Sequence, residues 1–530
     1  MSEVDLFIVN FFFFFFFLDN IDLGGWVNYN IGSYLVCDFV GFSYNSEYSS
    51  YVFLMLMVCS YISVVYSYHY FSDGKFAWLL SFIMICFSLV MLILVSTSSF
   101  LVSLVLWEYL GLVSYILICF YDTNDSLRAG FITLVTSRFG DVCLFILVAL
   151  FYCGGYANSV LFSFIVFLVV STKSASFPFV SWLLEAMRAP TPVSSLVHSS
   201  TLVASGVWMI GGYYYVIGVD YGGSLICFLQ FCSVLTIIVS SVSALFYVDV
   251  KRLIALSTSS NISWVFLILS VGDYILAFVQ LLVHAISKCL LFTFVGDYII
   301  SSFGGQNKNQ VDTNIYGNIF SLIYMFILLL GLSGFPFMGL YFSKHVFLSS
   351  VVSMSYFSII FLLFVIVGLM LSSAYSVRLF IIFFGGLTFG CYTTRMCFYI
   401  VLIVPMIGTF LGYHLSFSLF NYFSGFMSLL SLFILFIMFI GVLLGVYIGY
   451  WCSEYSKSWI GYLCGIDYLV YMYNCFMSIF WDYVFLGIFR WEVGLFDYIC
   501  YLVNSFSVSY MFEVSCLVFG TFIVVLYLFF

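Results

Sequence analysis

The sequence predicts an all-α polytopic membrane protein, and three observations carry this prediction. Hydrophobic residues fill 65% of the 530 positions and charged residues only 7%, whereas a soluble domain carries about 25% charged residues. Apolar segments of the roughly 20 residues that a helix needs to cross a bilayer recur along the chain. Two of these segments are interrupted by proline after small residues. We expect about 15 transmembrane helices, two inverted helix repeats containing broken helices, a long lateral amphipathic helix and a final C-terminal anchor helix.

The apolar segments follow one another in a regular order. They fall at approximately residues 4–18, 50–68, 76–97, 99–120, 129–152, 158–177, 192–217, 224–247, 253–271, 275–300, 317–349, 356–383, 397–416, 426–450 and 508–530. We expect six regions, which are N-terminal helices with a surface loop at 1–75, a first repeat at 76–230, a second repeat at 231–383, additional transmembrane helices at 384–450, the lateral helix at 451–507 and the anchor at 508–530.

Two segments carry the pattern of broken helices. One break falls at Lys173–Pro178, and the other falls at Gly331–Pro336 and is followed by Lys344. Segment 317–349, which contains the second break, is too long for one span. Proline removes a backbone donor and leaves carbonyl groups open to a cation or to water. Paired breaks indicate an inverted repeat with a site at the bilayer midplane; an ordinary packing kink is the alternative interpretation.

Three stretches are too polar to span the membrane. Residues 453–500 are aromatic and apolar, but they carry charges at a density that a spanning helix does not tolerate. These charges are Glu454, Lys457, Asp467, Asp482, Arg490, Glu492 and Asp497. The composition favours an amphipathic helix that lies along the membrane plane. Residues 19–49 and 301–316 are predicted to be loops.

Charge and cysteine usage exclude several classes of function. The net charge is −9, and the absence of a basic patch argues against nucleic-acid binding. Lysine and arginine are so sparse that they give little indication of orientation; Lys251 and Arg252, predicted to lie in a short loop, are the only adjacent basic pair. The 16 cysteines are scattered without a CxxC pair and are interpreted as small apolar side chains. The abundance of phenylalanine and tyrosine suggests a T-rich organellar gene.

Several charges lie inside the apolar segments, where each costs about 2.5–3.5 kcal/mol on insertion scales. They are Glu108, Arg138, Asp141, Lys173, Lys288, Lys344 and Arg378. His284 and Lys288 are four residues apart and share a helix face with Gln280, and His198 lies among serines and threonines. Buried groups that exchange protons suit a relay. The alternative is that Arg138 and Asp141 neutralise each other and that His198 only packs.

Residues 173–208, KSASFPFVSWLLEAMRAPTPVSSLVHSSTLVASGVW, resemble the signature of the NADH-ubiquinone oxidoreductase chain 5 family, the distal antiporter-like membrane subunit of respiratory complex I. Further motifs of that family are matched over roughly residues 30–380. They are Trp107–Gly111, Ser137–Asp141, His284–Lys288, Gly334–Pro336 with Tyr341–Lys344, and Ser373–Arg378. The resemblance implies that both repeats are antiporter-like.

The resemblance also implies roles for the buried groups. Glu108 and Lys173 would form the ion pair of a first half-channel, and His198 would lie between this pair and the centre. Lys288, with His284, would be the central relay residue, and Lys344 would lie nearest the exit. Arg138, Asp141 and Arg378 are secondary candidates that hold helices together. The lateral helix would brace neighbouring subunits.

By the same resemblance, the chain is a non-redox subunit of a proton-translocating NADH:ubiquinone reductase, multi-pass in the mitochondrial inner membrane. Quinone reduction elsewhere in the complex would drive proton movement. This chain would hold no cofactor; FMN, iron–sulfur clusters and ubiquinone are expected in other subunits. The expected partners are other membrane-arm subunits, especially the neighbouring antiporter-like subunit, together with accessory subunits and membrane lipids.

The chain departs from the family pattern at several positions. His345 stands where the family has Asp, Gln280 stands where bacterial relatives have a further His, and the loop 312–317 lacks the usual basic residues. The phenylalanine-rich span at 4–18 aligns with the family's second helix, so we expect the first family helix to be missing.

Three other functions are open. The chain could be the large subunit of a multi-subunit cation/proton antiporter, whose large subunits share the same motifs. It could be a haem-bearing respiratory subunit, but such a site needs pairs of histidines on facing helices and the histidines fall one to a segment. These are His69, His198, His284, His345 and His414. It could also be a membrane scaffold without a transport role.

Overall fold

The computed structural model describes an all-helical core for this chain. The described residues are 46–71, 74–97, 100–152, 160–212, 223–301, 306, 319–335, 338–353, 359–384 and 427–451, with isolated residues 475, 478, 479 and 494. Contacts divide the chain into two units, Met1–Cys464 and Gly465–Phe530. All the helices below belong to the first unit, and no strand occurs among the described residues.

The helices begin and end close to the limits that hydropathy predicts. They are α2 (Ser46–Tyr70), α3 (Gly74–Ser96), α4 (Phe100–Ile118), η2 (Cys119–Tyr121), α5 (Asn124–Tyr152), α6 (Val160–Lys173), α7 (Ser181–Ala186), α8 (Thr191–Val193), η3 (Ser194–Thr201), α9 (Leu202–Gly212), α11 (Gly223–Ala244), α12 (Val250–Val271), α13 (Tyr274–Ser301), α14 (Ile319–Ser333), α15 (Tyr341–Ser353), α16 (Ile359–Phe384) and α19 (Met427–Trp451). Ten spans in the described part are long and apolar enough to cross a membrane.

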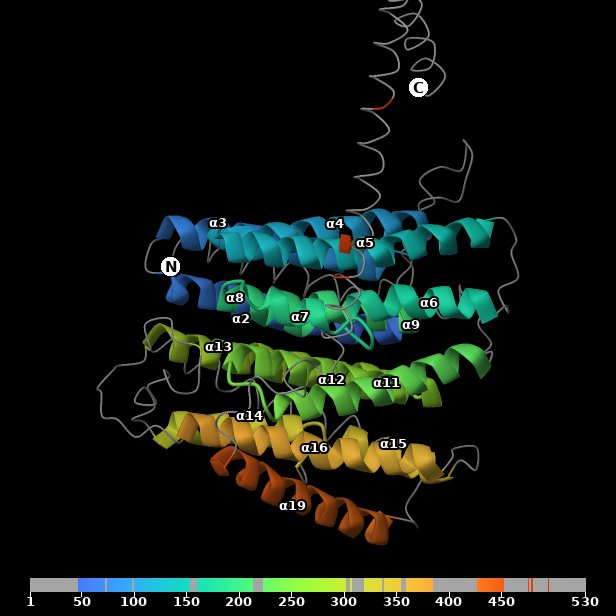
Figure 1. Ribbon diagram of the computed structural model, residues 1–530, viewed down its shortest axis with the longest axis vertical. Coiled ribbons are helices and arrows are strands. Elements are labelled where there is room, and N and C mark those ends of the chain that lie inside the picture. The colour runs from blue at the N-terminus through green and yellow to red at the C-terminus, as the bar shows by residue number, and fades with distance from the viewer. Residues whose placement is uncertain are drawn as a thin grey trace, which may run out of the picture. The chain divides into compact units, whose positions relative to one another are not determined.

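The helices of the first unit lie side by side in successive layers, which follow chain order except that α2 lies in the layer of α6 to α9 (Figure 1). The layer of α3, α4 and α5 contacts the layer that holds α2 and α6 to α9, and the layer beyond that holds α11, α12 and α13. Beyond it lie α14, α15 and α16, with α19 packed against α16. The inner helices are almost completely buried, since 94% of the α12 span and 89% of the α13 span are covered. Polar groups on these two helices therefore face protein and not lipid.

Both predicted breaks are present. Helix α6 ends at Lys173 and the chain resumes as α7 at Ser181, while α14 ends at Ser333 and α15 begins at Tyr341. Gly334 has φ +80, a left-handed conformation that costs other residues more than glycine. The breaks are therefore confirmed, whereas the inverted relationship of the two repeats and the six region boundaries stay predictions.

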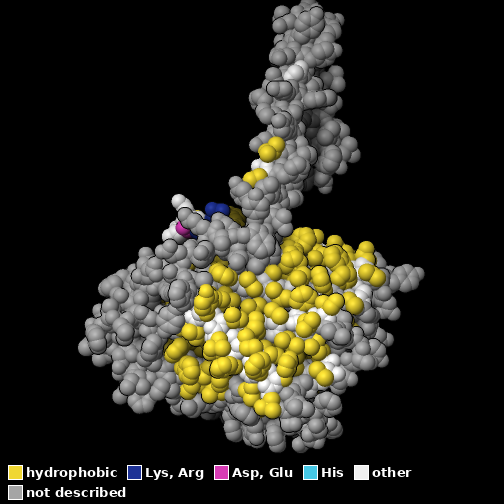
Figure 2. Space-filling view, turned by 60° about the horizontal axis from the view of Figure 1, so that its bottom comes forward, with side chains coloured by type: hydrophobic (Ala, Val, Ile, Leu, Met, Phe, Trp, Pro, Cys, Tyr) yellow, Lys and Arg dark blue, Asp and Glu magenta, His cyan; other side chains and the backbone are white. Residues whose placement is uncertain are grey.

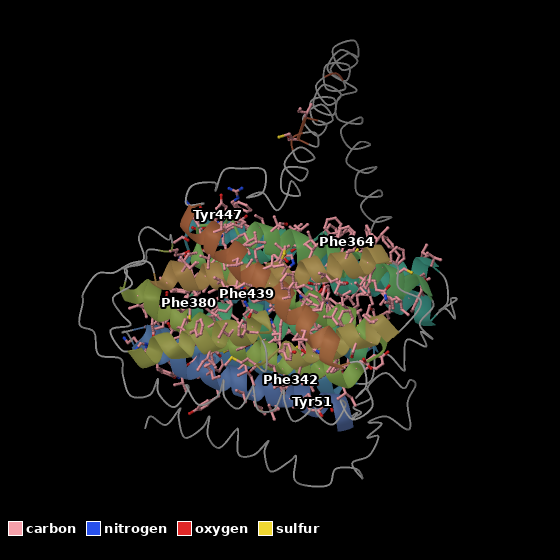
Figure 3. All side chains as sticks on the ribbon, turned by 90° about the horizontal axis from the view of Figure 1, so that it is seen from below. Tyr51, Phe342, Phe364, Phe380, Phe439 and Tyr447 are labelled. Atoms are coloured by element: carbon pink, nitrogen blue, oxygen red, sulfur yellow. The ribbon has the colours of Figure 1, made fainter. Side chains whose placement is uncertain are left out.

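The exterior of the bundle is apolar, as a lipid-facing surface requires. Figure 2 shows a broad hydrophobic face with few charged side chains among the described residues. On α19 Phe436 is 63% exposed and Phe439 59%, and on α16 Phe364 is 48% exposed; Figure 3 labels Phe364 and Phe439 on these two helices. Solvent water would oppose exposure of such large side chains, whereas hydrocarbon would not.

Three glycines at four-residue spacing bring α19 close to α16. A Cβ at Gly441 would overlap Ser373 and Met370, one at Gly445 would lie 3.0 Å from the Cα of Ala374, and one at Gly449 would lie 2.8 Å from the Ile381 side chain. Small residues at this spacing allow backbones to approach closely in a membrane, where packing replaces the hydrophobic effect.

Several predicted elements lie outside the described residues. They are the first span at 4–18, residues 19–45 of the loop predicted at 19–49, Pro336, the loop 312–317, the span at 397–416, His414, the lateral helix at 451–507 apart from residue 451 and four isolated positions, and the anchor at 508–530. The loop prediction is wrong for residues 46–49, which form the first turn of α2.

Candidate functional site

The first break places Lys173 in the interior, at the last residue of α6. Its side chain is 1% exposed, and its Nζ donates to the backbone oxygen of Trp107 at 3.5 Å. The same Nζ lies 5.4 Å from the centre of the Trp107 ring, a distance at which an ammonium is attracted to an indole. Gly111, one turn further along α4, leaves room for the lysine, since a Cβ there would stand 3.5 Å from Nζ.

Lys173 belongs to a chain of four alternating charges, of which Asp141 and Lys173 are buried. Arg138 pairs with Glu108 and lies 3.5 Å from Asp141 Oδ2, and Lys173 Nζ lies 3.8 Å from Asp141 Oδ1. The direct Glu108–Lys173 pair expected from the resemblance is therefore replaced by two pairs joined through Arg138. The local pairing of Arg138 with Asp141 is present, but it is not self-contained. In the order Glu108, Arg138, Asp141, Lys173, the arginine has a carboxylate on each side, so a small movement shifts it from one to the other.

His198 lies on η3, a π-helical segment in which Thr201 Oγ1 donates to Leu196 O at 2.9 Å across five residues. Single π-helical turns occur frequently at functional sites. The His198 side chain is completely buried beside Trp182, with the ring centres 6.3 Å apart. Neither ring nitrogen is hydrogen-bonded within the described chain. Serines and threonines flank His198 along η3, as the sequence predicts.

Lys288 lies at the centre of the described core, on α13. Its Nζ donates to Ser257 Oγ and to Ile254 O, the latter at 3.3 Å. Both acceptors belong to α12 and both are neutral, so no carboxylate of the described chain is paired with this lysine. His284 is buried one turn away, and the charges of Lys288 and Lys344 both act on it. Gln280 continues the same face.

The second break places Lys344 beside Ser333, where α14 ends. Its Nζ donates to Ser333 O at 3.0 Å, and Ser372 Oγ on α16 donates to the same oxygen at 3.2 Å. Lys344 Nζ also lies 5.4 Å from the centre of the Trp264 ring. Lys173 and Lys344 are thus held alike, each by a backbone carbonyl and an indole face.

The two remaining sequence candidates at this end have packing contacts. Arg378 Nη1 donates to Ala244 O at 2.6 Å, which ties α16 to the end of α11. His345 is 3% exposed and its ring centre lies 5.5 Å from that of Tyr341.

Sequence reasoning misplaced Lys251. It lies in the first turn of α12 and not in a loop, its side chain is buried, and its Nζ donates to Ala189 O at 3.2 Å. The burial arises because the turn before α8 covers it, which no local pattern around Lys251 indicates. Arg252 stays at the surface, with Nε 3.4 Å from Asp249.

Comparison with known proteins agrees with the motifs. A family model described as NADH:quinone oxidoreductase/Mrp antiporter, TM, matches residues 97–372. NADH-ubiquinone oxidoreductase chain 5 of Locusta migratoria is 31% identical over 486 residues, which cover 87% of this chain and 81% of that protein. The protein of the same name from Mytilus edulis is 34% identical over 338 residues, covering 62% of this chain and 59% of that protein.

Solved structures share the fold. The Mrp complex of Dietzia sp. DQ12-45-1b matches with a TM-score of 0.64 at 18% identity, covering 91% of this chain and 55% of that chain. The archaeal membrane-bound sulfane sulfur reductase matches with a TM-score of 0.69 at 16% identity, covering 85% of this chain and 94% of that chain. At this identity the likeness concerns the arrangement of helices.

Proposed function

The chain belongs to the NADH-ubiquinone oxidoreductase chain 5 family, and from this membership we propose that it is a membrane-arm subunit of that enzyme which translocates protons. The protons move through a buried relay of Glu108, Lys173, His198, Lys288 and Lys344, with His284 beside Lys288. Quinone reduction elsewhere in the complex drives the movement.

The single observation that carries this proposal is the set of three buried lysines, each held by oxygen acceptors. Lys173, Lys288 and Lys344 are 1–3% exposed, and each Nζ donates to a backbone carbonyl. Burial of a charged lysine in a membrane costs free energy, and a hydrocarbon side chain would fill the same space without that cost. A carbonyl accepts a hydrogen bond from the amine as well as from the ammonium form, so each lysine can lose and regain a proton without losing its place.

The four-charge chain supplies the first step of the relay. When Arg138 shifts from Glu108 toward Asp141, it competes with Lys173 for the Asp141 carboxylate. Lys173 then loses its counter-charge and releases a proton toward His198. The segment η3, which carries His198 and several hydroxyls, contacts α12, and Ser257 on α12 accepts a hydrogen bond from Lys288. We expect these hydroxyls to pass the proton on from His198.

The location of the chain, its number of spans and its partners form part of the same proposal. It lies in the mitochondrial inner membrane with about 15 spans, and its lateral helix braces a neighbouring antiporter-like subunit. It holds no redox cofactor, and FMN, iron–sulfur clusters and ubiquinone belong to other subunits. Accessory subunits and lipids complete its surroundings.

Replacement of Lys288 in the assembled complex tests the relay. We expect Lys288→Met to abolish proton translocation and to slow quinone reduction, while NADH oxidation by an artificial acceptor continues. Lys251→Met is the matched control, because it also removes a buried lysine bonded to a carbonyl but lies outside the relay. Full proton translocation and quinone reduction in Lys288→Met would refute the relay.

The alternative is the large subunit of a multi-subunit cation/proton antiporter, which the fold shared with the Dietzia Mrp complex favours. Purification of the native complex distinguishes the two functions. FMN and iron–sulfur clusters that co-purify with the chain support the first function, and sodium-dependent proton exchange without them supports the second.

A further inference from the structure

A second group of titratable side chains lies outside the relay, at one end of the bundle. His69 near the end of α2 faces Asp297 near the end of α13, with Nδ1 3.4 Å from Oδ1. The His69 side chain is 33% exposed and that of Asp297 is 11% exposed. The pair therefore reaches the bundle surface on one side and its interior on the other.

Contacts between helix ends show what else lies at this end. Arg188, in the turn before α8, lies 3.1 Å from Asp125 at the start of α5. Lys251 at the start of α12 donates to Ala189 O in the same turn. The turn that leads into the His198 segment therefore lies at the same end of the bundle as the starts of α5 and α12.

Tyr66 and Thr191 continue inward from the pair. The ring of Tyr66 stacks on that of His69, with centres 6.0 Å apart. The Tyr66 hydroxyl packs against Gly296, and a Cβ at Gly296 would lie 2.7 Å from Thr191 Oγ1. The lack of a side chain at Gly296 thus brings two buried hydroxyls together, directly beside Asp297.

Further hydroxyls lie between Thr191 and His198 along the chain, and with Thr191 they form a row. Ser194 and Ser195 follow Thr191 and are completely buried. Ser194 Oγ donates to Thr191 O and Ser195 Oγ donates to Pro192 O, each at 2.8 Å. Because these hydrogens are donated to the backbone, the oxygens keep lone pairs that accept a proton donor.

We propose that the His69–Asp297 pair is a proton-binding site at the surface end of this row, and that it exchanges protons with His198 through Tyr66 and Thr191. Imidazole and carboxylate exchange protons readily with water. For a proton to pass, each hydroxyl turns from its backbone acceptor toward the next oxygen, accepts one proton as it releases its own, and turns back before the next passage. The site rests on the proposed function, because it gives the relay an opening at the membrane surface.

Other charged and titratable groups flank the pair. On α2 the phenol of Tyr66 interacts electrostatically with Asp297 and with the phenol of Tyr70. The helices that pack against α2 and α13 add charged residues at the same end. These are Lys75, Asp249, Lys251 and Arg252.

A pair that only staples α2 to α13 would keep its role when Asp297 becomes asparagine, because an amide still accepts a hydrogen bond from His69. We expect Asp297→Asn in the assembled complex to lower proton translocation about tenfold and Asp297→Glu to restore it to near the wild-type rate. The control is Asp125→Asn, which removes an 82% exposed carboxylate at the same end and is expected to have no effect.

Two further variants keep the test decisive. His69→Gln lies at the exposed edge and should lower the rate as Asp297→Asn does, and Gly296→Ala should do so by displacing the Tyr66 hydroxyl while leaving the pair intact. Wild-type rates between pH 6 and 8 in Asp297→Asn and His69→Gln would overturn the site. If Lys288→Met still abolished translocation in that case, the proposed function would stand and only this inference would fall.

Discussion

Arg138 on α5 pairs with Glu108 on α4, whereas Lys173 pairs with Asp141 and not with Glu108. The same guanidinium lies 3.5 Å from Asp141, so one arginine serves two carboxylates. Arg138 is 38% exposed while Asp141 is 3% exposed. The arginine is therefore the member of the chain with the greatest freedom to move, and Asp141 is the fixed counter-charge of Lys173.

Asp141→Asn should cost more stability than Glu108→Gln. It leaves Lys173 buried without a counter-charge, and breaking a buried pair costs about 3–5 kcal/mol. We expect less assembled complex on native gels, partly recovered in the double variant Asp141→Asn, Lys173→Met, because that variant removes both charges. Equal losses in Asp141→Asn and in the double variant would contradict the pairing.

Trp264 should matter through its ring face. Its indole lies under Lys344 and is fully buried, and such a contact contributes about 0.5–2 kcal/mol. Trp264→Phe keeps a ring and should preserve proton translocation, whereas Trp264→Leu should lower it. The measurement is the number of protons moved per quinone reduced, and an identical ratio in both variants would argue against the contact.

Gly445→Val should separate α19 from α16. The added side chain would meet the Ala374 backbone, which cannot rotate away, and overpacking of this kind costs about 1–3 kcal/mol. Thermal unfolding of the solubilised complex should reveal the loss. Gly74→Ala is the control, because nothing lies within 4 Å of a Cβ at that position; if it destabilised the complex as much as Gly445→Val, close helix approach would not be the cause.

The end of the bundle that carries most lysines and arginines should face the compartment in which the chain keeps its positive charges, which is the matrix for a mitochondrial protein. Lys75, Arg128, Arg188 and Arg252 lie near the helix ends on the side of His69. The connections at the opposite end, 97–99, 153–159, 213–222 and 272–273, contain no lysine or arginine. Loops on the inner side of a membrane carry an excess of lysine and arginine, so the end near His69 is expected on that side.

Labelling with a membrane-impermeant maleimide checks this orientation. Cysteine at Asp125 should react above the wild-type background only in inside-out vesicles, and cysteine at Asp273 only in right-side-out vesicles. The reverse pattern would mean that the proton-binding pair opens to the other side.

Much of the fold could be predicted from the sequence because lipid-facing spans carry a strong hydropathy signal. The segment predicted at 76–97 is observed at Gly74–Ser96, and both breaks fall beside their small residues. Pairing across helices could not be predicted. Arg138 and Asp141 are close in sequence, which hides the pairing of Arg138 with Glu108 on another helix. Lys251 is buried by a turn distant in sequence, and the π-helical geometry around His198 has no local signal.

The neutral acceptors of Lys288 and Lys344 set an order of events. The first four charges sum to zero, two carboxylates against two cations, while each later lysine, when protonated, carries a positive charge that the described acceptors do not compensate. Both lysines act on His284, and like charges repel more strongly at low dielectric. A proton on Lys344 therefore makes it less favourable for another proton to bind at Lys288. We expect a proton to leave Lys344 before the next one arrives at Lys288.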